Sequence, residues 1–488
     1  MRIAIITENF LPKVDGVTRT LARLLEHLSK TGHQVILLGP ETNMTTYAGA
    51  DLVGTYGIPF FLYPELKFNF WRPKFTQKLV EFQPDVIHLV DPVFLGAFGL
   101  AVVRYYLPNV PIVSSYHTNL AVYCDHFGYG FMTSIMWRWN RYCHSFSRFT
   151  ACPSPSTKAI LHDHGFDKVR LWPRGVDISL FSPLQRSESL RAQWMGVSEL
   201  KSENKNVILY VGRVSYEKNI NLVIEAYKEM DHEKCHLVLV GHGPAFHEIQ
   251  SYCAAKRIPV TFTGYLQGKD LSQAYASADI FAFPSTTETF GQVVLEAMSS
   301  GLPVVGLDAE GVRDLVDDKR TGLLLNTSDL SAKDQQRKYR GLLELLVNQP
   351  RLLGQLRREA VKKAKTYTWY EAMECMVNVY QDAAGCSEEE LPKSLQLYLK
   401  DDSDGSRIQE QDLTRPIPTE PSSSNAAAAA AAADGSYTDD SGDSGVEEDY
   451  ALCEEKASLL SSHIKPSMYI NGKEEQSQRG TSIYWTNR

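Results

Sequence analysis

The chain has 488 residues, of which 43% are hydrophobic, and a formal net charge of −8. This length and apolar content support two ordinary domains with additional chain. No run of 18 or more apolar residues occurs, which argues against a membrane-spanning helix. The eight cysteines include no Cys-x-x-Cys pair, so we expect free thiols rather than a zinc site or a disulfide framework.

The charge is unevenly distributed along the chain. Residues 1–174 carry a net charge of +5 and residues 175–384 carry −2, whereas residues 385–488 carry −11. A basic first part and an acidic last part predict different partners for the two regions. Met1 leads directly into an apolar strand, so we expect no signal peptide and a cytoplasmic location.

The first strand is followed by a glycine turn at residues 15–18 and then by a helix with leucines on one face. Gly16 has no side chain, so the backbone of this turn can approach a diphosphate closely. Most glycine turns only join a strand to a helix, and this motif alone is therefore a weak signal. We expect further strands near residues 85–89 and 112–118.

Two later segments place polar residues just after apolar strands. His117 ends one strand, at the edge where open α/β sheets bind ligands. Arg213 and Lys218 lie five residues apart on the loop after residues 207–213, which begin a second α/β series. A guanidinium and an ammonium at this spacing suit a metal-free diphosphate clamp. The alternative is that both are solvated loop charges without a binding role.

The most informative segment runs from Phe283 to Gly306. An apolar strand stops at Pro284, a helix is expected over residues 292–299, and another apolar strand follows Pro303. The backbone N–H groups at the start of that helix favour an anion. Glu288 and Glu296 flank this point, and carboxylates beside a phosphate site suit recognition of sugar and ribose hydroxyls.

This segment closely resembles the Glu-x7-Glu signature of retaining glycosyltransferases of family 4. The resemblance extends to Gly-Arg-x4-Lys-Asn at residues 212–219, to Tyr-His-Thr at residues 116–118 and to Arg-Gly-Val-Asp at residues 174–177. It covers roughly residues 1–384, and the pattern is nearest to sulfolipid synthases and bacterial glycolipid mannosyltransferases. The chain departs from the family at His242, where an Asp is common.

The resemblance implies an α/β protein with the GT-B fold, in which two Rossmann-like parallel-sheet domains face each other across a cleft. The boundaries we expect are residues 1–174 for an acceptor-side domain, 175–368 for a nucleotide-sugar domain, 369–384 for a helix that crosses back, and 385–488 for a disordered acidic tail. The family's donor site maps onto Gly16, Arg213, Lys218, Glu288, Thr289, Phe290, Gly291 and Glu296, and its catalytic residues onto His117, Arg213, Lys218 and Glu288.

The resemblance thus predicts a hexosyltransferase that moves a sugar from a UDP- or GDP-sugar with retention, without a metal ion or another cofactor. The expected acceptor is a glycerolipid such as diacylglycerol, and no nucleic-acid partner is expected. Three alternatives stay open: transfer to a non-lipid glycan or glycoside, a GT-B sugar-nucleotide epimerase, and a non-catalytic nucleotide-sugar-binding protein. A Rossmann oxidoreductase is disfavoured because no Gly-x-Gly-x-x-Gly follows the first strand.

Two segments of the first domain interleave aromatic residues with Lys or Arg, namely residues 60–74 and residues 136–142 with Arg148. This composition is typical of segments that lie at a membrane surface, so we expect peripheral binding to an anionic membrane. The tail contains eight consecutive alanines at residues 426–433, and Ser441 and Ser444 lie in an acidic context suited to a kinase. We expect this tail to compete with anionic lipid for the basic first domain.

Overall fold

The structure is a computed structural model that describes residues 1–12, 15–60, 63–126, 129–199 and 205–385. The expected acidic tail, its alanine run and the two serines therefore lie outside the described residues. Six cysteines lie in the described part, and all six are free thiols, as expected from the sequence.

The first half of the chain forms an eight-stranded sheet, with strand order β10-β9-β8-β7-β1-β2-β4-β3. All neighbouring strands pair in parallel except β3 and β4. A separate antiparallel pair is formed by β5 (Gly57–Phe60) and β6 (Tyr63–Asn69). The strands of the large sheet are β1 (Arg2–Thr7), β2 (Gln34–Pro40), β3 (Thr46–Tyr47), β4 (Ala50–Thr55), β7 (Val86–Val90), β8 (Ile112–Ser115), β9 (Phe149–Cys152) and β10 (Val169–Leu171).

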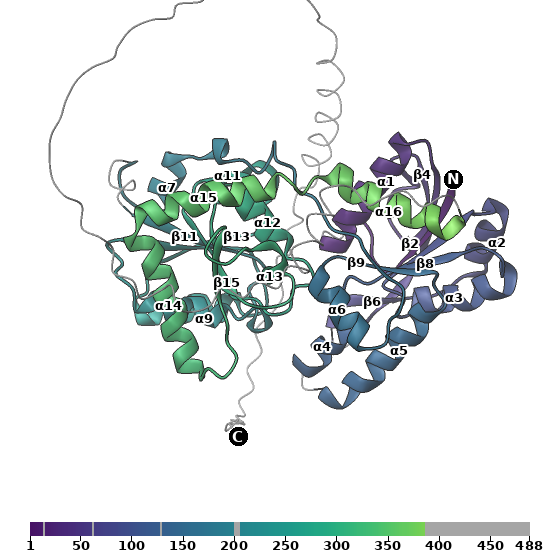
Figure 1. The fold of residues 1–488 in the computed structure, drawn as a ribbon, viewed down its shortest axis with the longest axis horizontal. Helices are drawn as coiled ribbons and strands as arrows, with labels where there is room; N and C mark the ends of the chain where they lie inside the picture. Colours follow the sequence, from purple (N-terminus) through teal and green to yellow (C-terminus); the bar gives the residue numbers. More distant parts are fainter. Residues whose placement is uncertain (13–14, 61–62, 127–128, 200–204, 386–488) are drawn as a thin grey trace, which may run out of the picture. The chain divides into compact units, whose positions relative to one another are not determined.

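Helices connect these strands and cover the sheet (Figure 1). They are α1 (Gly16–Lys30), α2 (Pro73–Phe82), α3 (Leu95–Tyr106), α4 (Leu120–His126), the 3-10 turn η1 (Gly130–Met132), α5 (Thr133–Ser145) and α6 (Pro155–Asp163). Alternate residues of β1 enter two different cores. Ile3 and Ile5 pack with α1, whereas Ala4 and Ile6 pack with α2 and α3. Burial on both faces explains why this strand is a continuous apolar run.

The second half forms a six-stranded parallel sheet, with strand order β13-β12-β11-β14-β15-β16. Its strands are β11 (Asn206–Val211), β12 (Cys235–Val240), β13 (Val260–Gly264), β14 (Ile280–Phe283), β15 (Val304–Leu307) and β16 (Gly322–Leu325). Its helical segments are η2 (Pro183–Gln185), α7 (Glu188–Met195), η3 (Tyr216–Lys218), α9 (Ile220–Lys228), α10 (Phe246–Lys256), α11 (Gly268–Ala276), α12 (Gln292–Ser299), α13 (Val312–Leu315), α14 (Ala332–Asn348) and α15 (Pro350–Ala364).

The last helix of the described chain, α16 (Trp369–Ala384), has the bounds that the sequence predicts. The Thr368 hydroxyl caps its first turn by accepting from the backbone N–H of Glu371 at 3.2 Å. The helix packs on α1, β7, β8 and β9 of the first sheet, far from its neighbours in the sequence. Its buried side chains Met373, Met376 and Tyr380 complete the core that β1 and α1 begin.

The apolar segment from Phe94 to Leu107 forms α3, but only one side of this helix is buried. Leu95, Leu100 and Val103 enter the core, whereas Phe98 and Tyr105 are exposed. Among the described residues, no helix is long and apolar enough to span a membrane.

Candidate active site

Three adjacent strands of the first sheet end at the same level, and polar residues follow each of them. Thr7 of β1 pairs with Val90 of β7, which in turn pairs with Ser115 of β8. Glu8, Asp91 and His117 therefore gather at the carboxyl edge of the sheet, where parallel α/β sheets bind ligands.

His117 is held at four polar atoms. Its backbone N–H donates to Asp91 Oδ1 at 2.7 Å, and its carbonyl oxygen accepts from Thr289 Oγ1 at 2.8 Å. Its ring nitrogens lie 2.9 Å from Ser115 Oγ and 3.4 Å from Arg174 Nη2. Burial, and then the nearby charge of Arg174, lower the pKa of His117 well below the usual range, so the ring is neutral at pH 7.

Arg174 is a residue for which the sequence analysis assigned no chemical role. Its guanidinium lies against the turn at Gly16, where a Cβ atom would be 2.5 Å from Arg174 Nη1. It also lies 5.9 Å from the centre of the Phe290 ring. A side chain at position 16 would therefore collide with the guanidinium, and glycine leaves room for it.

Glu288 and Lys218 form an ion pair, with Lys218 Nζ 2.6 Å from Glu288 Oε1. Ser285 Oγ donates to the same carboxylate oxygen at 3.0 Å. Burial by itself would raise the pKa of Glu288, but the charge and hydrogen bond of Lys218 hold it below the usual range. Glu288 is therefore an ionised acceptor at neutral pH, with Lys218 positioned beside it.

Glu296 lies on α12 and is in a different electrostatic state. It is 3% exposed, and its carboxylate accepts from Tyr275 OH at 3.1 Å and lies 3.5 Å from Arg19 Nη1. Burial raises the pKa of Glu296 to about 7 against the opposing effects of Arg19 and Tyr275. This carboxylate is thus poised to change charge near neutral pH.

The start of α12 matches the expected anion site in its backbone geometry. Gly291 precedes the helix in a left-handed conformation, with φ of 89°, which glycine adopts without strain. The first amide groups of a helix lack partners within the helix, so they can bind an anion. Thr289 and Phe290 lie in the turn just before it, and Phe290 is buried.

Arg213 lies on the loop that follows β11. Arg213 Nη1 lies 4.0 Å from Glu217 Oε1. Lys218 ends the short turn η3 on the same loop. Both expected clamp cations therefore lie beyond the carboxyl end of β11. His242 lies after β12 and stacks on Phe246, with ring centres 4.6 Å apart.

Sequence reasoning missed several ionisable residues at these strand edges. Asp91 accepts from the backbone of His117 and, at 2.9 Å, from Thr118 Oγ1. Glu8 Oε1 accepts from the N–H groups of Phe94 and Gly96, and burial raises the pKa of Glu8 to about 7. Each residue directly follows a strand, and this position is the signal that was available in the sequence.

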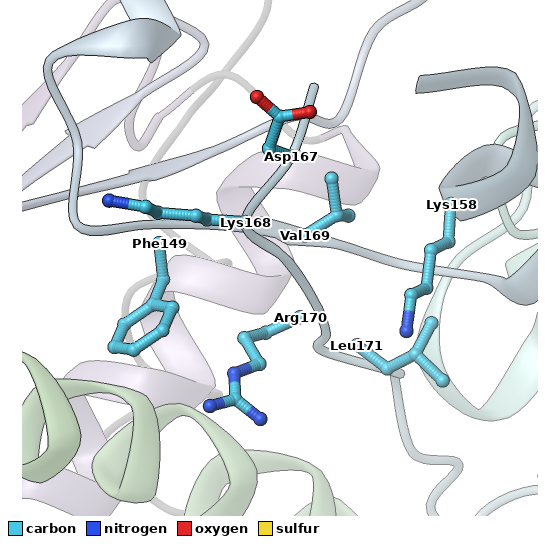
Figure 2. Close-up of a pocket in the computed structure, with 7 residues that line it drawn as sticks. All are labelled: Phe149, Lys158, Asp167, Lys168, Val169, Arg170 and Leu171. Atoms are coloured by element: carbon cyan, nitrogen blue, oxygen red, sulfur yellow. The ribbon is translucent and has the colours of Figure 1, made fainter. Parts of the chain in front are cut away.

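The described part of the chain has a further hollow and no metal-binding cluster. No group of three or more His, Cys, Asp or Glu side chains there is placed to hold a metal ion. A hollow of about 310 Å³ lies over β9 and β10, and Figure 2 shows the seven residues that line it. None of the expected site residues lines this hollow, whose charged residues are Lys158, Lys168, Arg170 and the acidic Asp167.

Comparison with known proteins identifies the family. Residues 14–180 match the model described as Glycosyltransferase Family 4, and residues 196–366 match that of Glycosyl transferases group 1. Over 334 residues the chain is 37% identical to a GDP-mannose-dependent alpha-mannosyltransferase of Mycolicibacterium smegmatis, which covers 67% of this chain and 84% of that protein. The chain belongs to glycosyltransferase family 4. It is a nucleotide-sugar-dependent hexosyltransferase, as the sequence predicts.

A more distant relative agrees with this membership, and a solved structure shares the fold. The chain is 31% identical to a sulfoquinovosyl transferase of Arabidopsis thaliana, over 78% of this chain and 74% of that protein. Sucrose-phosphate synthase of Thermosynechococcus elongatus has a similar structure, with a TM-score of 0.66, 20% identity, and coverage of 79% of this chain and all of that one. With two parallel-sheet α/β domains in the chain, this likeness confirms the GT-B fold.

Proposed function

We propose that this glycosyltransferase moves a sugar from a UDP- or GDP-sugar to a glycerolipid, with retention at the anomeric carbon. The Lys218–Glu288 ion pair is the observation that supports the proposal, because a lysine can offset the charge of a leaving phosphate and an ionised carboxylate can accept from sugar hydroxyls. A related alpha-monoglucosyldiacylglycerol synthase of Streptococcus pneumoniae, 27% identical over 66% of this chain and 75% of that protein, supports a diacylglycerol-type acceptor.

In this proposal the protein works by stabilising charge on the leaving group. Arg213 and Lys218 bind the diphosphate together with the amides of Phe290 and Gly291 at the start of α12. Glu288 and Thr289 hold the donor sugar, Glu296 accepts from the ribose hydroxyls, and the Gly16 turn lies against the phosphates. His117 shapes the site near the reacting carbon.

The first test is direct detection of the product. Expression in a heterologous host, followed by mass spectrometry, should reveal a new glycolipid that carries one added hexose or modified hexose. A new glycan or glycoside without lipid would instead support the non-lipid alternative. Consumption of the donor without any acceptor would support the epimerase alternative.

Replacing site residues provides the second test. We expect Lys218→Ala and Glu296→Ala each to lower the transfer rate by at least about two orders of magnitude, since removing one charge-stabilising group at such a site costs roughly 3 kcal/mol or more. Initial rates and circular dichroism are measured for each variant. Lys228→Ala is a matched control, because this half-buried lysine on α9 pairs with Glu225 and is not one of the expected site residues. Near-normal rates in correctly folded Lys218→Ala or Glu296→Ala protein would contradict the site assignment.

We also propose that the diphosphate clamp needs no divalent ion, because two protein cations, Arg213 and Lys218, are available for it. Transfer rates should therefore be largely unchanged after incubation with EDTA and removal of the chelate. A complete loss of activity that magnesium or manganese restores would show that the clamp is incomplete without a metal ion.

A further inference from the structure

Arg174 is a buried cation that forms no close ion pair among the described residues, although the more distant carboxylates of Asp15, Asp91 and Glu288 favour its charge. Its side chain belongs to a residue that is 6% exposed, and its Nε atom is buried without a hydrogen-bond partner. Within the described part of the chain, no carboxylate lies within 4 Å of it, whereas Lys218 and Arg213 each have one. For Arg174 the cost of burial outweighs the attraction of these distant carboxylates, and a bound anion would relieve this cost.

A chain of buried hydrogen bonds leads from Arg174 to the crossover helix α16. Arg174 Nη2 lies 3.4 Å from His117 Nδ1, and His117 Nε2 lies 2.9 Å from Ser115 Oγ. The same hydroxyl lies 2.8 Å from His88 Nε2, and His88 Nδ1 lies 2.8 Å from Tyr380 OH. These hydrogen bonds connect the segment after β10, strands β8 and β7, and helix α16, and all five residues are buried.

Chemistry determines the direction of every bond in this chain. A guanidinium has only donors, so His117 Nδ1 must accept from Arg174. Burial keeps the rings of His117 and His88 neutral, and it lowers the pKa of His88 to about 3. The proton of His117 is therefore on Nε2 and is donated to Ser115.

The remaining two bonds follow from the same reasoning. Because Ser115 accepts from His117, its own hydroxyl proton is donated to His88 Nε2. The proton of His88 is then on Nδ1, which donates to the oxygen of Tyr380. Both ring nitrogens of His117 are thus used within the protein, and neither is available to act on a substrate in this arrangement.

We propose that Arg174 contacts the phosphate groups of the donor, and that His117, Ser115, His88 and Tyr380 position its guanidinium. This inference rests on the proposed function, which supplies a nucleoside diphosphate as the ligand. The contact of Arg174 with Gly16 places the guanidinium at the turn expected to approach the diphosphate. Burial lowers the pKa of Arg174 to about 10, so it remains charged at pH 7.

Binding measurements with Arg174→Gln test the phosphate contact. Calorimetry is run with GDP and UDP, and with guanosine and uridine as ligands that lack phosphate. We expect the variant to bind the nucleoside diphosphate roughly ten- to a hundredfold more weakly, the effect of losing a hydrogen bond to a charged group, and to bind the nucleoside unchanged.

The outcomes separate this inference from the proposed function. An equal loss for nucleoside and nucleoside diphosphate, or no loss for either, would overturn the role of Arg174 while leaving the donor site in place. Failure of the wild-type protein to bind either nucleotide or its sugar conjugates would instead overturn the proposed function.

Ring nitrogen-15 NMR tests the positioning chain without requiring turnover. In the wild-type protein we expect the proton of His117 on Nε2 and that of His88 on Nδ1. Tyr380→Phe removes the acceptor for His88, so we expect the protons of both rings to change nitrogen and nucleoside diphosphate binding to weaken about tenfold. A wild-type His117 protonated at Nδ1 would contradict the proposed series of hydrogen bonds from Arg174 to Tyr380.

Tyr339→Phe is the matched control for this experiment. Tyr339 is also fully buried, and its hydroxyl donates to the Val305 carbonyl at 2.9 Å, away from the chain. We expect this variant to leave both histidine signals and nucleotide binding unchanged. If it changed them as much as Tyr380→Phe does, the effect would be a general loss of packing and the positioning role would be wrong.

Discussion

The two carboxylates of the Glu-x7-Glu motif differ in their charge state although both are buried. Glu288 has Lys218 at 2.6 Å and stays ionised, whereas Glu296 has only the more distant Arg19 and the Tyr275 hydroxyl. The free-energy cost that burial adds to ionisation is therefore offset by Lys218 at Glu288, whereas Arg19 and Tyr275 offset much less of it at Glu296. In the proposed mechanism, Glu296 must be ionised to accept from two ribose hydroxyls.

This difference predicts a pH dependence of nucleotide binding. The pKa of Glu296 is raised to about 7, so its carboxylate becomes protonated as the pH falls through 7. We expect the affinity for the donor nucleoside diphosphate to decrease between pH 8 and pH 6, measured by calorimetry. Glu296→Gln is the control, because it lacks this titration and retains only the pH dependence of the nucleotide phosphate itself.

The same shift has a consequence for stability, with a defined sign. A carboxyl whose folded pKa is raised contributes stability below its unfolded value of 4.5, and this contribution is lost as the pH rises through about 7. The melting temperature of nucleotide-free wild-type protein should therefore fall relative to Glu296→Gln between pH 6 and pH 8. Parallel curves for the two proteins would contradict the assigned titration.

At the scale of elements, α3 and α5 carry many exposed aromatic residues. Trp139 Nε1 donates to the Val93 carbonyl just before α3, and Arg104 of α3 lies 4.1 Å over the ring of Phe146 just after α5. These two contacts place the helices side by side. The exposed apolar residues on and beside them, which we name the α3–α5 surface, are Phe98, Tyr105, Tyr106, Phe131, Ile135, Trp139 and Tyr142.

The structure changes the membership of the expected membrane surface. Trp137 stacks on His164 with ring centres 3.7 Å apart, and Arg148 donates to the carbonyl of Ala383 on α16. These two residues therefore support the fold rather than a lipid contact. The side chains of residues 59–68 lie outside the described part, so that portion of the first expected segment stays a prediction.

We expect the α3–α5 surface to bind anionic membranes. Phe131→Ala combined with Ile135→Ala should lower co-sedimentation with vesicles containing anionic lipid about tenfold or more, because burying each side chain contributes roughly 1.5–3 kcal/mol. Tyr265→Ala is a control on the second sheet, where Tyr265 is likewise exposed. Equal recovery of wild-type protein in the supernatant with and without vesicles at low salt would reject the surface.

At the scale of the whole molecule, the chain combines a basic first half with a strongly acidic last segment. The charges are +5 for residues 1–174 and −11 for residues 385–488. A segment attached to the same chain has a high effective concentration near its own domains. The hollow shown in Figure 2 is lined by Lys158, Lys168 and Arg170 and by one acidic residue, Asp167. Its excess of basic residues would attract acidic side chains.

We expect truncation after Gly385 to raise both lipid binding and transfer rate at low salt. The gain should shrink as salt rises, because exposed charges are screened within about 8 Å at physiological ionic strength. Both quantities are measured for the two proteins across ionic strengths. Phosphates on Ser441 and Ser444, each adding roughly −1.5 to −2 charges, should strengthen the inhibition.

Two controls define the outcome of this prediction. Lys158→Ala combined with Lys168→Ala in the full chain should reproduce part of the gain if the tail binds at the hollow. Identical salt curves for the full and truncated proteins would show that the acidic segment has no inhibitory role.

Local patterns in the sequence determined the elements, their order and the family motifs. The helix at Gln292–Ser299 has the bounds that its local pattern predicts, because helix-forming residues and turn residues act over a few neighbouring positions. The bounds of the last helix, Trp369–Ala384, are those that the family resemblance implies. The motif residues Glu288, Glu296 and Lys218 were also readable, since the spacing of a family motif is a property of the sequence itself.

Only the tertiary structure decided which residues share an environment. Burial and the proximity of Lys218 or Arg19 set the different pKa values of Glu288 and Glu296, and neither is visible from their spacing. The series of hydrogen bonds from Arg174 to Tyr380 joins residues more than 200 positions apart, because α16 packs back on the first sheet. Electrostatics and hydrogen bonding depend on distance in space, and sequence alone specifies distance only for close neighbours.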